Sequence, residues 1–450
     1  MQSLRLSHVP WPAAVALAAG LVVRVAALSV PGTGDVIAWK TWSYVATSEG
    51  PASVYGHEFP PVPHVLRFGD SSSEANYPPL AIEELAVIGR SYWFASGGVF
   101  PDGVALTMTI RGAIVLADTA MAALIFVTIR RFNGARAAWW CAAAYWISPA
   151  VLLATTLGYI DVFFALPAVG AVVTAASGRP IVAGALFGAA VMTKPQALFV
   201  GPAVALAIWN AGDSGQAWRR LLAATKSATI LAAVVMLPVV FAGTTLNMLR
   251  AMGSLVRHDM LAGNACNLWW IVGYVIQVVA AVHRGDPAPA RTVADIVQIS
   301  SLPAEWYVSP RLVGAALTCA ATAWALGIAR GARELALFAA LAAFTADAYF
   351  VLSAQVHENH FFVVIPLLVL TATLRREFTP IVTALGVVFA LNLYLFYGVG
   401  GEGAPDIART LTVVDSTVLL SVVNCAVFAW FAMVLRRACE SAPPRFSPKI

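Results

Sequence analysis

Long apolar runs alternate with short polar or basic segments along the whole chain. Many of the runs approach the length of about 20 residues that a helix needs to cross a hydrocarbon core of about 30 Å. This pattern predicts an all-α polytopic membrane protein. We expect membrane-spanning helices at about 11–30, 103–129, 137–157, 159–176, 180–193, 196–211, 224–242, 311–329, 334–353, 360–374, 379–398 and 413–435.

The first run follows Arg5 and resembles a secretory signal in its charge pattern. It is longer than the apolar core of such a signal, and no small-residue cleavage site follows it. We therefore interpret it as a retained first membrane helix.

Composition supports the membrane assignment. Hydrophobic residues make up 60% of the 450-residue chain and charged residues only 11%, against about 25% charged in soluble domains. The net charge of +5 comes from Lys and Arg in short loops, as in cytoplasmic loops of membrane proteins, so no nucleic-acid partner is expected. The five cysteines are scattered without a CxxC pair, which predicts neither a disulfide framework nor a zinc site.

The apolar run 268–282 decides the topology. If it crosses the membrane, the arginines after it lie outside. If it returns or lies in the interface, they lie inside, as the positive-inside rule favours. The chain then forms a single domain, 1–450, with about twelve crossings and both ends cytoplasmic. The polar segments about 31–102, 243–310 and 354–360 all fall on the non-cytoplasmic side, where we expect the function.

Asp35 begins the first of these outer segments, a few residues past the first apolar run. A carboxylate at the headgroup boundary is partly desolvated and can accept a proton from a hydroxyl group, as a general base does. The alternative is a helix N-cap or a solvated loop acid, since Asp commonly starts helices. Asn76–Leu80 (Asn-Tyr-Pro-Pro-Leu) follows in the same segment. It either borders a site beside Asp35 or only starts an interfacial helix at Pro79.

Several segments in the order of the chain resemble the GT-C glycosyltransferases. Bacterial integral-membrane enzymes related to the GPI mannosyltransferases are most similar, and the dolichyl-phosphate-glucose-dependent glucosyltransferases also look similar. The resemblance is carried by Asp35 with the tryptophans after it, Asn76–Leu80, Gly158–Phe163, Thr193–Leu198, Asn264–Trp270 and Gln355–His360.

The resemblance implies a GT-C-like bundle of about 11–13 transmembrane helices with outer-face loops and interfacial helices. It implies that Asp35 is the catalytic base and that His357 helps to hold the phosphate of a lipid carrier. The chain departs from the family at Tyr159, where Gln is usual, so the role of Asp161 stays open. It also has Asn76 where an acidic residue often precedes Tyr-Pro-Pro.

A departing phosphate needs cations and hydrogen-bond donors. Several basic residues fall on the predicted outer side, although about half of such side chains are expected only to be solvated or to snorkel. The His-Glu-Asn-His sequence at 357–360 falls short of a closed metal site and can equally cap a helix, so no metal is expected. The candidate substrate-binding residues are Asn76, Tyr77, Asp161, Lys194, Gln196, Arg250, Arg257, His258, Trp269, His357, Glu358 and His360.

Charged residues inside the apolar runs are either functional or stabilise the bundle. Arg111 and Asp118 lie seven residues apart and can pair with each other or with neighbours. Asp347 lies well inside a later run. Arg24 either snorkels or faces the same site as Asp35.

The sequence therefore predicts a multi-pass enzyme of the bacterial plasma membrane. It would transfer a hexose or pentose from a polyprenyl-phosphate-linked sugar to an acceptor hydroxyl, with inversion and in a mannosyltransferase-like manner. The acceptor would be a glycolipid, a glycan or a protein, and no cofactor would be obligatory. The alternatives are a lipid or polysaccharide transporter or flippase, which should concentrate polar groups at the midplane, and a non-catalytic envelope-assembly protein.

Overall fold

The computed structural model describes residues 9–55, 75–212, 214–255, 258–303, 308–401, 403 and 405–441. These residues form an all-α protein, as predicted. The α-helices are α1 (Trp11–Ala27), α2 (Gly34–Ser48), α3 (Pro79–Ala95), α4 (Val104–Trp146), α5 (Pro149–Leu157), α6 (Asp161–Ala176), α7 (Pro180–Thr193), α8 (Gly201–Asn210), α9 (Ala217–Phe241), α10 (Thr245–Leu255), α11 (Leu268–His283), α12 (Pro310–Ala329), α13 (Leu335–Leu352), α14 (Val364–Leu374), α15 (Thr379–Tyr397), α16 (Asp406–Thr410) and α17 (Ser416–Glu440).

Short elements connect these helices. They are the 3-10 helices η1 (Pro51–Val54), η2 (Pro195–Val200), η3 (Ser214–Gln216), η4 (Pro289–Arg291), η5 (Ile299–Ser301), η6 (Glu358–Phe361) and η7 (Arg376–Phe378) and the strands β1 (Ala262–Gly263) and β2 (Val356–His357). The two strands are parallel partners, with Ala262 opposite Val356 and Gly263 opposite His357. This pairing joins two outer loops that lie far apart in the sequence.

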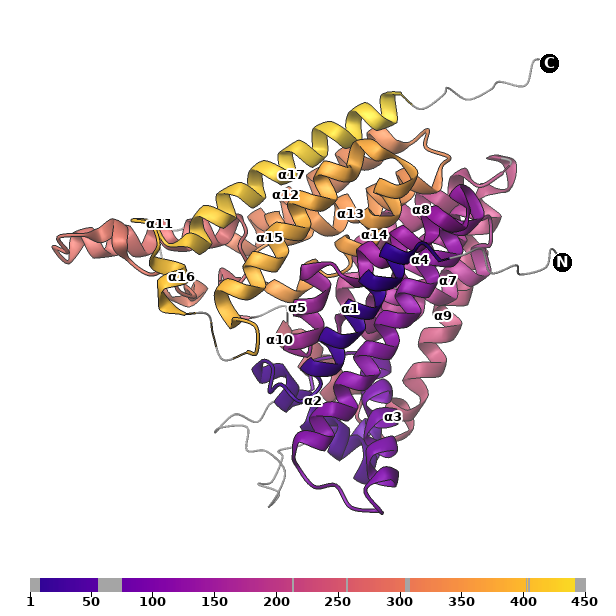
Figure 1. Ribbon diagram of the computed structural model, residues 1–450, viewed down its shortest axis with the longest axis horizontal. Helices are drawn as coiled ribbons and strands as arrows, with labels where there is room; N and C mark the ends of the chain where they lie inside the picture. The colour runs from indigo at the N-terminus through magenta and orange to yellow at the C-terminus, as the bar shows by residue number, and fades with distance from the viewer. Residues whose placement is uncertain are drawn as a thin grey trace.

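Within the described residues, six helices are long and apolar enough to cross a membrane by length and composition, and shorter apolar helices accompany them (Figure 1). The chain is thus an integral, multi-pass membrane protein. Helix α13 lies at the centre, with 89% of its apolar window buried, whereas only 11% of that of α9 is buried. Helix α9 therefore leaves most of its apolar surface for lipid.

Two of the predicted spans are interrupted. The run 137–157 is divided between the end of α4 and helix α5, which starts at Pro149. The run 196–211 begins as the 3-10 helix η2 after Pro195 and becomes α-helical only at Gly201. Proline favours such breaks because it has no N–H to donate and its ring collides with the preceding turn. Helix α4 is itself kinked at Gly134.

The loops gather at two opposite ends of the bundle. At one end the Asn133 side chain donates a hydrogen bond to the Thr373 carbonyl (3.1 Å), and Arg375 binds Glu334 (3.0 Å). These loops are basic, and all were predicted to face the cytoplasm. The segments around Asp35 and His357 meet at the other end. The grouping of the loops agrees with the predicted parity, and the side of the membrane that each end faces stays a prediction.

The run 268–282 forms helix α11, and the chain after this helix returns to the region where the helix begins. At its start, the Trp270 indole donates to the Thr417 hydroxyl at the beginning of α17 (2.8 Å). After the helix, the Ala294 N–H donates to Asp415, at the same end of α17 (3.0 Å). Figure 1 shows α11 beside the start of α17, at the left of the view. The interpretation that this run returns rather than passes through the bundle agrees with this geometry.

Of the two pairings left open for Asp118, the structure has the one with a neighbouring helix. Arg24 forms an ion pair with Asp118 (3.2 Å) and stacks over the Trp146 ring. Arg24 therefore neither snorkels nor faces the Asp35 site, and Arg111 is not the partner of Asp118. Helix α1 packs against α4 and places Arg24 opposite Asp118, so the nearest cation comes from another helix. Asp347 is fully buried, and neither of its oxygens has a hydrogen-bond partner among the described residues.

Candidate active site

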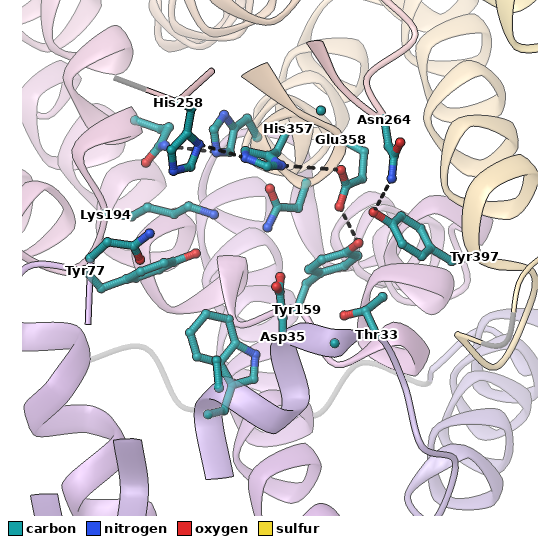
Figure 2. Close-up of a pocket in the computed structure, with 18 of the residues that line it drawn as sticks. Thr33, Asp35, Tyr77, Tyr159, Lys194, His258, Asn264, His357, Glu358 and Tyr397 are labelled. Carbon is teal, nitrogen blue, oxygen red and sulfur yellow. Dashed lines mark hydrogen bonds and ion pairs between the residues drawn. The ribbon is translucent and has the colours of Figure 1, made fainter. Parts of the chain in front are cut away.

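Asp35 lies in the first turn of α2. The helix begins at Gly34, and Thr33 is held in place by its N–H, which donates to the Leu157 carbonyl (3.0 Å). Asp35 makes no capping hydrogen bond, so the N-cap alternative is wrong. Its carboxylate instead points into a cavity (Figure 2). The amino end of a helix carries a partial positive charge, which favours a carboxylate at this position.

The cavity has a volume of about 470 Å³ and lies among the outer loops. It brings together side chains from α2, the loop before α3, the break between α7 and η2, and the paired loops at β1 and β2. The candidate residues that line it are Asp35, Asn76, Tyr77, Lys194, Gln196, His258, His357, Glu358 and His360.

Three of the described candidates do not line the cavity. Asp161 lies directly behind Lys194. Trp269 donates its indole N–H to the Leu352 carbonyl (2.8 Å) and anchors α11, because the Asn267 side chain caps that helix and turns the ring into the bundle. Arg250 is exposed on α10. The predictions that Trp269 and Arg250 bind substrate are therefore not met by the geometry, and Arg257 lies outside the described residues.

A buried ion pair forms one wall of the cavity. The Lys194 ammonium lies 2.6 Å from Oδ1 of Asp161, and both side chains are almost fully buried. Lys194 is in extended conformation between α7 and η2, which frees it to point inward, and its Nζ lies 5.4 Å from the centre of the Tyr77 ring. Oδ2 of Asp161 has no partner among the described residues. Asp161 thus lies behind Lys194 and balances its charge.

A cluster of histidines lines the cavity next to Lys194, with His258 above it in the view of Figure 2. Nε2 of His357 lies 3.3 Å from Nδ1 of His258, and Nε2 of His360 lies 3.0 Å from the Gln196 amide. Partial burial, together with His258 and Lys194, lowers the pKa of His357 below its usual range. The ring is therefore neutral at neutral pH and acts as a hydrogen-bond donor or acceptor rather than as a cation.

Aromatic and amide groups complete the lining. Trp39 packs edge to face against Trp42 and Tyr77, and Trp42 lies tilted against Tyr77, with ring centres 5.2–5.6 Å apart. The Tyr159 hydroxyl donates to Glu358 (2.5 Å). Aromatic faces and planar hydrogen-bonding groups are the usual means of binding a small polar ligand in a pocket.

Sequence reasoning missed some of these residues. The Asn264 amide donates to the Tyr397 hydroxyl (3.0 Å), and both side chains line the cavity. Asn264 and Tyr159 lie in two of the segments that resemble the GT-C enzymes, so the sequence could have identified them. Tyr397 ends an ordinary apolar run, and no motif in the sequence marks it.

The electrostatics favour a basic Asp35. Burial raises its pKa to about 6; Lys194 acts in the opposite direction, and Asp161 adds to the increase. The carboxylate is thus largely ionised at neutral pH and is still a stronger base than an exposed Asp. Among the residues that the structure describes, no group of three or more His, Cys, Asp or Glu side chains is arranged to hold a metal ion.

Fold and site define a polytopic membrane protein with a polar cavity at one end of its bundle. The sequence matches no protein-family profile and no curated protein. ArnT from Cupriavidus metallidurans, solved bound to undecaprenyl phosphate, is similar in structure with a TM-score of 0.49 and 15% identity, covering 95% of this chain and 77% of that one. AglB, an oligosaccharyltransferase from Archaeoglobus fulgidus solved with an inhibitory peptide and a dolichol-phosphate, gives a TM-score of 0.41 and 14% identity, covering 97% and 56%. These are remote likenesses.

Proposed function

We propose that this protein is a membrane glycosyltransferase that transfers a hexose or pentose from a polyprenyl-phosphate-linked sugar to an acceptor hydroxyl. The reaction would take place on the non-cytoplasmic face of a bacterial plasma membrane, with inversion at the anomeric carbon. Asp35 is the general base. The GT-C resemblance of the ordered motifs is in keeping with this assignment.

One observation carries the proposal. Asp35, Lys194 and His357 come from three distant parts of the sequence and line the same cavity. A base, a cation and a neutral hydrogen-bonding ring are the groups that a transfer from a lipid phosphate requires, and they must converge on one substrate. The aromatic and amide lining suits a sugar ring.

The chemistry follows from these positions. The acceptor hydroxyl attacks the anomeric carbon and gives its proton to the Asp35 carboxylate. The bond from the anomeric carbon to the phosphate oxygen breaks, and the oxygen leaves with the electron pair. Lys194 and the histidines then stabilise the lipid phosphate through charge and hydrogen bonds. The polyprenyl chain stays in the lipid between the helices.

A transporter or flippase is the alternative. It would use the cavity for binding without breaking a glycosidic bond, and the paired broken helices of many transporters would be expected at the midplane. The described polar groups that line the cavity lie at one end of the bundle and not at the midplane of the membrane. This arrangement favours a reaction at the membrane surface.

The test measures transfer of labelled sugar by the full chain, produced in a bacterial strain whose own gene for this protein has been deleted. Membranes of that strain without the protein are the blank. Polyprenyl-phosphate mannose, glucose, galactose and arabinose are supplied in turn. We expect the labelled sugar of at least one donor to appear in a product in which it is no longer linked to a lipid phosphate. Movement of labelled lipid across the bilayer without loss of label would instead show a flippase.

The reaction should depend on pH through Asp35. Its pKa of about 6 means that the active carboxylate is lost as the pH falls, so kcat/KM should decrease about tenfold per pH unit below that value and level off above it. An ordinary Asp, near 3.8, would keep full activity at pH 5. The measurement is the initial transfer rate from pH 4.5 to 8, with folding monitored at each pH. A rate that stays constant down to pH 5 would contradict a base with this pKa.

A further inference from the structure

Arg111 on α4 holds the carboxyl ends of two other helices. Its Nη1 donates to the Ala27 carbonyl at the end of α1 (3.1 Å). The same nitrogen donates to the carbonyls of Thr155 (3.4 Å) and Thr156 in the last turn of α5. The last carbonyls of a helix have no partner within the helix, and a guanidinium group satisfies them well. One buried side chain therefore joins α1 and α5.

The turns that follow these two helices are packed against each other. Gly32 after α1 and Gly158 after α5 both have left-handed backbone conformations, with φ of 83° and 85°. The Trp39 indole donates to the Gly158 carbonyl (3.1 Å). A Cβ atom on Gly32 would lie 2.5 Å from Nη2 of Arg111, and one on Gly158 would lie 2.4 Å from Cγ2 of Val36. Both positions thus require glycine for conformation and for space.

Each of these turns leads to a carboxylate of the site. Asp35 follows Gly32 by three residues and lies in the first turn of α2. Asp161 follows Gly158 by three residues and starts α6, where it binds Lys194 at 2.6 Å. The contact between the two turns therefore sets the position of Asp35 relative to the Lys194–Asp161 pair. Arg111 lies next to this contact.

We propose that Arg111 is a positioning residue that fixes Asp35 relative to the Lys194–Asp161 pair by clamping the ends of α1 and α5 together. This inference rests on the proposed glycosyl transfer. Arg111 touches neither substrate nor the reacting atoms. It acts through the Gly32 and Gly158 turns, and the contact of Gly158 with Val36 sets the spacing between them.

The first test compares two Arg→Lys variants on the same helix interface. Arg111→Lys keeps the charge, but its side chain is shorter and draws the donor nitrogen back from the position of Nη1, which makes all three carbonyl contacts. Arg24→Lys changes the Asp118 pair one turn earlier on α1, and the contacts of Arg24 with Asp118, Gly20 and Trp146 do not include the two turns. We expect kcat per folded molecule to fall by about 10²-fold in Arg111→Lys, since a displacement of about 1 Å can have that effect. Its pH midpoint should also move, because the surroundings of Asp35 change. Arg24→Lys should keep both values.

A second set of variants changes the same junction without touching Arg111. Gly158→Ala should reduce kcat because its new methyl group collides with Val36. Gly158→Ala combined with Val36→Ala removes the colliding atom and should recover part of that loss, which independent effects would not do. Val36→Ala alone is the reference for the pair.

The outcomes separate the two levels of the proposal. Absence of transfer by the wild-type chain from every donor would remove the proposed function and this inference with it. Transfer by the wild type, with equal losses of kcat per folded molecule in Arg111→Lys and Arg24→Lys and an unchanged pH midpoint, would overturn the positioning role alone. Lack of recovery in the double variant would show that the spacing of the two turns does not control the rate.

Discussion

Asp35→Asn should lower kcat for sugar transfer by about 10²–10⁴-fold, the range that a positioned general base contributes. The amide has the size of the carboxylate but accepts no proton at neutral pH. Asp35 makes no capping hydrogen bond, so the substitution should leave the start of α2 intact. The measurement is the rate of labelled transfer per folded molecule, with donor binding determined separately. We expect donor affinity to change far less than kcat.

The matched control is Asp347→Asn. It makes the same chemical change at a buried carboxyl group that does not line the cavity and has no hydrogen-bond partner among the described residues. It should transfer sugar at close to the wild-type rate. Near-normal transfer by Asp35→Asn would exclude Asp35 as the base, and an equal loss in both variants would indicate a general effect of removing buried carboxyl groups.

The helices could be predicted from the sequence because apolar length is what a membrane requires of them. The predicted runs 311–329, 379–398 and 180–193 correspond to α12, α15 and α7 within a residue or two. The interruptions at Pro149 and Gly201 were less accessible, because a proline inside an apolar run can either kink or end a helix. The sequence left open whether Asp118 pairs with Arg111 or with a neighbour, because the choice depends on the packing of α1 against α4, which no spacing along the chain reveals.

The candidate site was predictable where polar residues stood out from their surroundings. Asp35, Lys194 and His357 each interrupt an apolar context or begin an outer loop, and charge parity placed them on one side. Trp269 was included as a candidate because the whole segment Asn264–Trp270 was treated as part of the site. In the structure, Asn267 caps α11 and the Trp269 ring points away from the cavity. Arg111 was considered as one possible partner of Asp118, and its contacts with the carbonyls of α1 and α5 become visible only when three helices are assembled.

Lys194→Met should have the second largest effect, on stability as well as on transfer. It leaves the Asp161 carboxylate buried without a cation, a change that typically costs about 3–5 kcal/mol. It also removes the ammonium expected to stabilise the departing phosphate, for which a loss of about 10²–10³-fold in kcat is reasonable. Thermal unfolding in detergent and labelled transfer measure the two effects separately.

A double variant distinguishes the structural from the catalytic contribution of Lys194. Lys194→Met combined with Asp161→Asn removes both charges of the 2.6 Å pair, so it should recover much of the stability that Lys194→Met loses. Transfer should stay as low as in the single variant, because the leaving phosphate still lacks its cation. The control is Lys40→Met, which breaks a more exposed pair with Asp102 at 3.0 Å and should cost less stability and leave transfer unchanged. Recovery of transfer together with stability in the double variant would mean that Lys194 serves the fold and that the phosphate is held by other groups.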